Sequence, residues 1–247
     1  FSAFLSGGIV MSMGLSLPEE SQKNYTFISF IIGQSFMIIP LILFLLSKKE
    51  PLIKRLRLNP VTINIMFFSF MFSLGLIIIS DEIDRLIQIF IPAPEYILDL
   101  NNLLQPESIL GFFLLFTAVA IIAPVGEELL FRGFLQQFLE KYWRDITKSI
   151  LIIALFFAII HLNPFWFIQI YILGVVLGFL SWKTNSIIPS LILHSLNNTV
   201  ALILSFVDLE KDNFYLLNGH VSPPIIILAV FFVIKGFTKI NKEKTLT

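Results

Sequence analysis

The sequence predicts an all-α fold, a polytopic membrane helix bundle with about eight transmembrane helices. Hydrophobic residues make up 56% of the 247 positions and charged residues only 14%, whereas soluble domains have about 25% charged residues. The mean hydropathy is +0.87, and long apolar segments recur along the chain. A soluble domain has too little polar surface to cover so apolar a chain, but lipid accepts apolar surface everywhere. We therefore expect a single membrane-embedded domain over residues 1–247.

Composition also excludes several classes of function. Lys and Arg total 17 and Asp and Glu total 17, so no net charge attracts nucleic acid, and we expect no nucleic-acid partner. The chain has no Cys, which excludes disulfides, thiolate nucleophiles, Cys-ligated zinc and iron–sulfur clusters. Because the chain begins at Phe1 rather than at Met, we expect a few leading residues to be missing.

The apolar segments are taken as spans because a helix needs about 20 residues to cross a bilayer. They lie near residues 1–17, 25–47, 61–80, 109–139, 149–163, 165–182, 187–207 and 222–238. The fourth is too long for one straight span, and Pro124 within it predicts a kink. Asn163 and Pro164 divide the fifth segment from the sixth.

Basic residues predict the orientation of these spans. When the loops are assigned alternately to the two sides, thirteen Lys and Arg fall on one side and three on the other. Loops rich in Lys and Arg stay in the cytoplasm. We therefore expect both termini, and the opening of any site, on the cytoplasmic side. The compact loops favour a bacterial cytoplasmic membrane.

Ionisable residues at membrane depth are few, and each costs about 3 kcal/mol or more unless it has a partner or a function. They are Glu127, Glu128, Arg132, His161 and His194. Glu127 and His161 lie on either side of a basic loop, at about 20 Å from it on helices that rise 1.5 Å per residue. His194 and Asn198 enter from the same side to a similar depth. Groups from three helices should therefore meet.

Local spacing separates the roles of these residues. Glu128 and Arg132 are four residues apart and share a helix face, so they should form an ion pair. Glu127 points about 100° away, has no such partner, and is the better candidate for a base. His194 and Asn198 are also four apart and could donate hydrogen bonds to an oxyanion. A helix clamp and satisfied core histidines are the plainer interpretations, but the matched depth favours chemistry.

The motifs resemble those of the CPBP family of intramembrane proteases, which includes the type II CAAX prenyl endopeptidases and the bacterial Abi proteins. They are Glu127-Glu128-x-x-x-Arg132, Phe157-x-x-x-His161 and His194-x-x-x-Asn198. The resemblance covers about residues 109–207, which we expect to be the motif-bearing catalytic core. It implies that Glu128, Arg132 and Phe157 support the helices that carry the site.

The resemblance also implies a reaction, the hydrolysis of a peptide bond in a membrane-bound peptide or protein, with a prenylated C-terminal peptide as one candidate substrate. Glu127, assisted by His161, would deprotonate a water, and His194 and Asn198 would stabilise the oxyanion. No cofactor is expected. Zinc held by Glu127, His161 and His194 is the alternative, although the H-E-x-x-H motif is absent.

Two readings from other functional classes stay open at this point. The chain could be a non-catalytic membrane scaffold or a bacteriocin-immunity protein that retains the motifs. It could also be a small proton-coupled transporter whose buried Glu and His form a relay. A transporter should show paired broken helices, and a pseudoenzyme should have lost a motif residue. The sequence shows neither feature and does not determine the oligomeric state.

Overall fold

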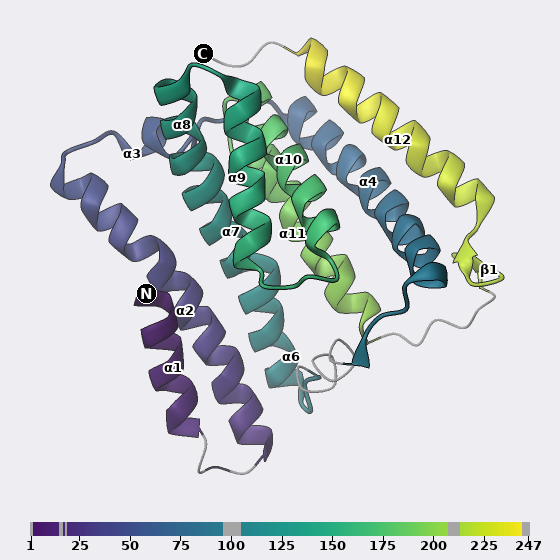
Figure 1. The fold of residues 1–247 in the computed structure, drawn as a ribbon, viewed down its shortest axis with the longest axis horizontal. Coiled ribbons are helices and arrows are strands. Elements are labelled where there is room, and N and C mark those ends of the chain that lie inside the picture. The colour runs from purple at the N-terminus through teal and green to yellow at the C-terminus, as the bar shows by residue number, and fades with distance from the viewer. Residues whose placement is uncertain (1, 15–16, 18, 96–104, 207–212, 244–247) are drawn as a thin grey trace.

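The computed structural model describes residues 2–14, 17, 19–95, 105–206 and 213–243, and these are almost entirely helical (Figure 1). The first four helices are α1 (Ser2–Gly14), α2 (Glu19–Ser47), the short α3 (Leu52–Arg55) and α4 (Ile63–Phe90). One long helical segment follows, made of α6 (Ile109–Phe116), the π-helix η1 (Thr117–Ile122), α7 (Ala123–Glu127), the π-helix η2 (Glu128–Leu135) and α8 (Gln136–Trp143). The remaining elements are α9 (Ile146–Ile160), α10 (Phe167–Thr184), α11 (Ile188–Leu204), the strands β1 (Leu216–Leu217) and β2 (His220–Val221), and α12 (Pro223–Lys242).

The predicted all-α polytopic bundle is confirmed. Among the described residues, five helices are long and apolar enough to cross a membrane: Ser21–Ser47, Ile63–Phe90, Ile109–Trp143, Phe167–Thr184 and Pro223–Lys242. The helices α9 and α11 are equally apolar but have only 15 and 17 residues, and α1 has 13. The protein is therefore an integral membrane protein, and the count of eight spans stays a prediction.

The bundle has two flanks and a centre (Figure 1). On one flank α1 packs on α2, and on the other α4 packs on α12. The centre holds the long segment from α6 to α8 together with α9, α10 and α11. An apolar core joins this centre to α4 and α12, and its members include the fully or almost fully buried Phe157, Leu177 and Leu193. The centre thus contains all three sequence motifs.

Several predicted boundaries differ from the ends of the helices, and two of these differences have a clear physical cause. The third span does not end near residue 80, because α4 continues to Phe90, and the spacing of four between Asp81 and Arg85 sustains the helix with a contact of 3.0 Å. The fifth span does not reach residue 163, because α9 ends at Ile160. There Leu162 takes a left-handed φ of 50°, which ends the helix.

A β-hairpin interrupts the all-α pattern in the loop before α12. Leu216 pairs with Val221 and Leu217 with His220, around a turn in which Asn218 and Gly219 have φ of 54° and 81°. Two central residues with positive φ are the requirement of the tightest hairpin turns, and Asn-Gly meets it. The Asn218-Gly219 dipeptide is a sequence signal for this turn, and the sequence prediction did not use it.

The loop that precedes α4 fastens the ends of several helices. The backbone carbonyl of Arg57 accepts a hydrogen bond from the Ile187 amide at 2.9 Å, and its guanidinium pairs with Glu140. The Asn59 carbonyl accepts from Ser186 Oγ at 2.6 Å. This end of the bundle also carries the basic loops. Their Lys and Arg residues therefore lie on loops that these hydrogen bonds hold to the helix ends.

Close packing of α12 on α4 depends on glycine, which gives the first prediction. A Cβ at Gly75 would overlap the Ala229 carbonyl oxygen, a backbone atom that cannot move aside. We expect Gly75→Val to destabilise the protein by about 1–3 kcal/mol through overpacking, seen as a lower Tm in detergent. Gly8→Val is the control, because a Cβ at Gly8 meets nothing within 4 Å. Equal Tm values for the two variants would contradict this account of the packing.

Candidate active site

The long helical segment changes its hydrogen-bond register just before the first motif. The Ala123 amide bonds to the Ala118 carbonyl, five residues back, which is the π register. In that register the Val119 carbonyl would need the amide of residue 124. Pro124 has no N–H, so the Val119 oxygen accepts instead from Asn198 Nδ2 on α11 at 3.0 Å. The proline thus creates an acceptor that ties α11 to the motif helix.

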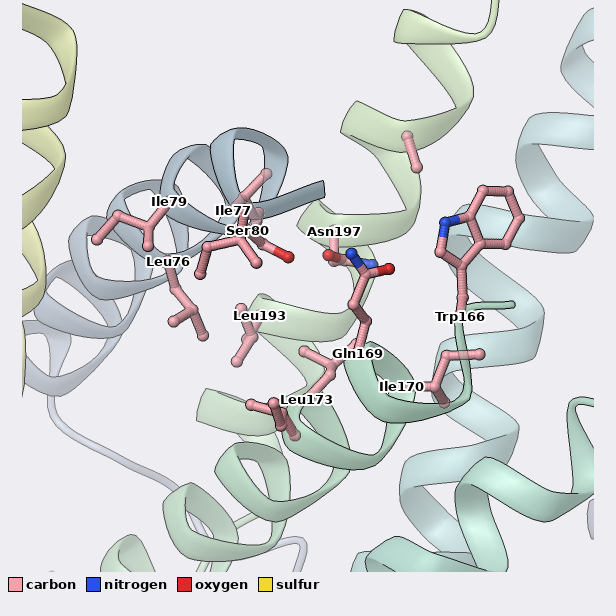
Figure 2. A pocket seen from close by; sticks show the side chains of 13 residues that line it. Leu76, Ile77, Ile79, Ser80, Trp166, Gln169, Ile170, Leu173, Leu193 and Asn197 are labelled. Atoms are coloured by element: carbon pink, nitrogen blue, oxygen red, sulfur yellow. The ribbon is translucent and has the colours of Figure 1, made fainter. Parts of the chain in front are cut away.

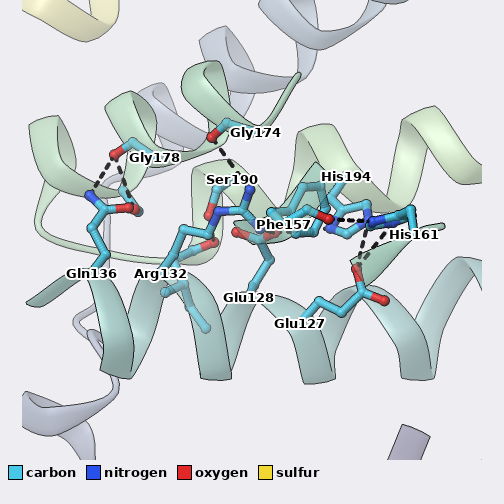
Figure 3. A network of polar contacts seen from close by, with 12 residues as sticks. Glu127, Glu128, Arg132, Gln136, Phe157, His161, Gly174, Gly178, Ser190 and His194 are labelled. Carbon is cyan, nitrogen blue, oxygen red and sulfur yellow. Dashed lines mark hydrogen bonds and ion pairs between the residues drawn. The ribbon is translucent and has the colours of Figure 1, made fainter. Parts of the chain in front are cut away.

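Glu127 lies directly after this break and faces two imidazoles (Figure 3). Its Oε2 is 3.7 Å from His194 Nε2 and 3.9 Å from His161 Nε2. Both distances exceed that of a direct hydrogen bond and suit a bridging water. Its side chain is 10% exposed, while that of His161 is 31% exposed. The structure therefore brings together three of the four residues that the sequence placed at a similar depth, and the fourth, Asn198, donates to the Val119 carbonyl.

The tautomers of the two histidines follow from their other partners. His161 Nδ1 lies 2.6 Å from the Phe157 carbonyl oxygen, which can only accept, so Nδ1 carries the proton. His194 Nδ1 lies 2.9 Å from Glu128 Oε1 and donates in the same way. In the neutral state each ring consequently turns a bare Nε2 lone pair toward Glu127. Each Nε2 can take up a proton there, and it donates only when its ring is doubly protonated.

Glu128 and Arg132 form the predicted pair, at 2.8 Å and with both side chains 0% exposed. Glu128 Oε1 also accepts from His194, so this carboxylate joins the motif helix to α11. Arg132 stacks its guanidinium 4.1 Å from the centre of the Phe157 ring and donates to the Gly174 carbonyl at 3.4 Å. One buried ion pair thus contacts α9, α10 and α11.

A further buried residue, Gln136, continues this polar face and was missed from the sequence. It donates to the Gly178 carbonyl at 3.0 Å and to Glu140 Oε1 at 2.9 Å. Glu128, Arg132, Gln136 and Glu140 are spaced by four, so one face of η2 and α8 carries a polar row. Figure 3 shows the first three of these residues. The four-residue spacing was the signal that could have revealed it, and Gly178 leaves the space that the Gln136 amide fills.

An apolar cavity of about 350 Å³ lies beside the site, between α4, α10 and α11 (Figure 2). Asn197 lines it and donates to Asn198 Oδ1 at 3.4 Å, which connects the cavity wall to the motif residue. Trp166 Nε1 and Gln169 Nε2 both donate to Asp84 Oδ1, at 3.3 and 2.9 Å. These hydrogen bonds join the start of α10 to α4, and two of the cavity's lining residues make them.

Glu127, His161 and His194, the three side chains of the zinc alternative, lie close together. Within the part of the chain that the structure describes, no group of three or more His, Asp or Glu side chains is arranged to hold a metal ion. The expectation of no cofactor and the alternative of zinc held by Glu127, His161 and His194 both stay predictions. Because the chain has no Cys, no ligand set in it can include a thiolate.

Comparison with known proteins supports the resemblance seen in the motifs. Residues 109–200 match the family model described as type II CAAX prenyl endopeptidase Rce1-like. This confirms the predicted family resemblance. The UPF0177 protein YbdI of Lactococcus lactis subsp. lactis (strain IL1403) is 27% identical over 122 residues, 48% of this chain and 64% of that protein. The chain thus spans less than two thirds of the length of this curated relative. No solved structure matches the chain.

The buried pair gives the second prediction. We expect Glu128→Ala to destabilise the protein by about 3–5 kcal/mol, because it leaves Arg132 charged and unpaired in an apolar interior. The double variant Glu128→Leu with Arg132→Met should recover much of this loss, since it removes both charges together. Tm values in detergent measure the effect.

Glu50→Ala is the matched control for that experiment. Glu50 accepts two hydrogen bonds from Arg55, but the two side chains are 32% and 39% exposed, so water replaces the lost contact. A loss as large as that of Glu128→Ala would show that burial does not set the difference.

Proposed function

We propose that the protein is an intramembrane endopeptidase that hydrolyses a peptide bond of a membrane-associated substrate. The observation that supports this most directly is the Glu127 carboxylate with the two imidazole Nε2 atoms at 3.7 and 3.9 Å. The match of residues 109–200 to an endopeptidase family model supports the reaction class. A prenylated C-terminal peptide is the first substrate to test, because the description of that family specifies it.

The proposed mechanism starts from a water held between Glu127 and His161. Glu127 takes a proton from the water as its oxygen attacks the scissile carbonyl carbon, and His161 Nε2 orients the water by accepting its other hydrogen. The proton on Glu127 then passes to the leaving nitrogen as the C–N bond breaks. The products are a carboxylic acid and an amine, so water is the only co-reactant.

The tetrahedral intermediate carries a negative oxygen that needs donors. Asn198 has two amide hydrogens, one of which binds the Val119 carbonyl, so the second can serve the oxyanion. His194 Nε2 can donate when its ring is doubly protonated, with Nδ1 still bound to Glu128. Glu128 and Arg132 have no direct part in the reaction and fix the helix that presents Glu127.

The third prediction tests these roles in proteoliposomes with a peptide library that includes farnesylated C-termini. We expect Glu127→Gln and His161→Ala each to lower kcat by about 10²–10⁴-fold, the usual contribution of a general base, with little change in Tm. His220→Ala is the control, because this histidine lies on the hairpin and pairs with Glu82 at 2.9 Å, outside the site. Turnover at the wild-type rate in either site variant would refute the assignment.

The same assay separates the metal-free reaction from the zinc alternative. We expect cleavage to persist in EDTA and the purified protein to hold less than one zinc per chain. Loss of turnover with a chelator, restored by added zinc, would overturn the metal-free mechanism and keep the protease. If no peptide is cleaved under either condition, the endopeptidase is wrong and a scaffold, immunity or transport role replaces it.

We also propose that the basic end of the bundle faces the cytoplasm of a bacterial cell, as the distribution of Lys and Arg suggests. The fourth prediction uses single cysteines, which the Cys-free chain permits. An impermeant maleimide should label Leu217→Cys on intact cells and Thr147→Cys only after permeabilisation. Both sites are exposed, so a reversed pattern would mean a reversed orientation.

A further inference from the structure

A hollow at the basic end, between α3 and α8, has no part in the proposed reaction. Its volume is about 270 Å³. It is lined by Arg55, Phe134, Gln137, Phe138, Lys141 and Tyr142. We propose that this hollow binds the headgroup of one anionic phospholipid, with the phosphate on the two cations and the glycerol and upper acyl chain on the aromatic rings.

The charges in the hollow match a single phosphodiester. Arg55 gives two N–H groups to Glu50, at 2.7 Å each, through Nε and Nη2. No ion pair found among the described residues includes Lys141. The hydrogen bond from Arg55 holds the pKa of Glu50 below its ordinary value, and Lys141 acts in the same direction. With Glu50 ionised, the two cations leave one net positive charge, which one phosphate neutralises.

The other wall of the hollow is apolar and exposed. The Phe138 and Tyr142 rings stack with centroids 6.1 Å apart and an interplanar angle of 6°, although 57% and 73% of these residues are exposed. Aromatic and basic side chains at the end of a span lie at the level of the lipid headgroups. A free phosphate would leave this wall without a partner, whereas a lipid covers it.

The hollow is a fixed feature of the packing. The Gln137 amide donates to the Arg55 carbonyl at 3.0 Å and to the Gly133 carbonyl, so it braces α3 on α8. A Cβ at Gly133 would lie 2.7 Å from the Leu56 carbonyl oxygen, so the loop reaches η2 only because of this glycine. Basic pockets between helices at this level of a membrane are known to hold anionic headgroups.

The experiment uses the full chain in nanodiscs and in detergent. Phosphatidylglycerol is the probe, and phosphatidylcholine is the neutral comparison. Native mass spectrometry should show one retained phosphatidylglycerol per chain, and the lipid should raise Tm. The double variant Arg55→Gln with Lys141→Gln should weaken that binding at least 10-fold. Lys48→Gln with Lys49→Gln is the matched control, because it removes the same charge from the neighbouring loop and should leave binding unchanged.

Each outcome decides the proposal. Equal retention of phosphatidylcholine, or an equal loss of binding in both double variants, would overturn it, because either result means that no specific charged site exists. An equal rise in Tm with inorganic phosphate would also overturn it, since the occupant would then be a free anion. If the Arg55 and Lys141 variant does not fold, Tyr142→Ala replaces it. That variant should keep the charges and still lose at least 3-fold in lipid binding, and unchanged binding would count against the proposal.

Discussion

The structure depends on one fully buried ion pair, Glu128 with Arg132. A charged pair in an apolar interior gains stability when further contacts reach its donors and acceptors. Phe157 offers a ring face, Gly174 a carbonyl and His194 a ring N–H, and each comes from a different helix. The pair therefore requires α9, α10 and α11 to be in register, and that register places two Nε2 atoms around the neighbouring carboxylate.

Much of the site was predictable because helix geometry converts spacing into direction. The separation of four between Glu128 and Arg132 predicts their contact, and equal depth predicts that Glu127 meets His161. The partner of Asn198 was not predictable. It depends on the π register before Pro124 and on the absence of an N–H at that proline, which leave the Val119 carbonyl without a helix donor. Hydropathy does not indicate which carbonyl lacks a donor.

In the fold as in the site, hydropathy predicts which segments are helical, while polar contacts determine where a helix ends. Apolar windows gave the bundle, but α4 runs past its apolar part because Asp81 and Asp84 find partners along the helix and beyond it. The hollow beside α3 was out of reach for another reason. It depends on the contact between Gln137 and a loop 82 residues earlier in the chain. Such a contact arises only from the tertiary structure, so the local sequence pattern does not predict it.

The short length of α9 has a consequence for the lipid around the protein. Its 15 residues rise about 22 Å, against about 30 Å for a bilayer core. The turn after it therefore reaches hydrocarbon depth unless the bilayer thins. Asn163 Oδ1 accepts from the amides of Phe165 and Trp166, so two backbone donors are satisfied without water. A turn of this kind can therefore lie below the membrane surface. A membrane-bound peptide that reached this turn would contact polar backbone groups at a depth where the peptide is otherwise surrounded by lipid.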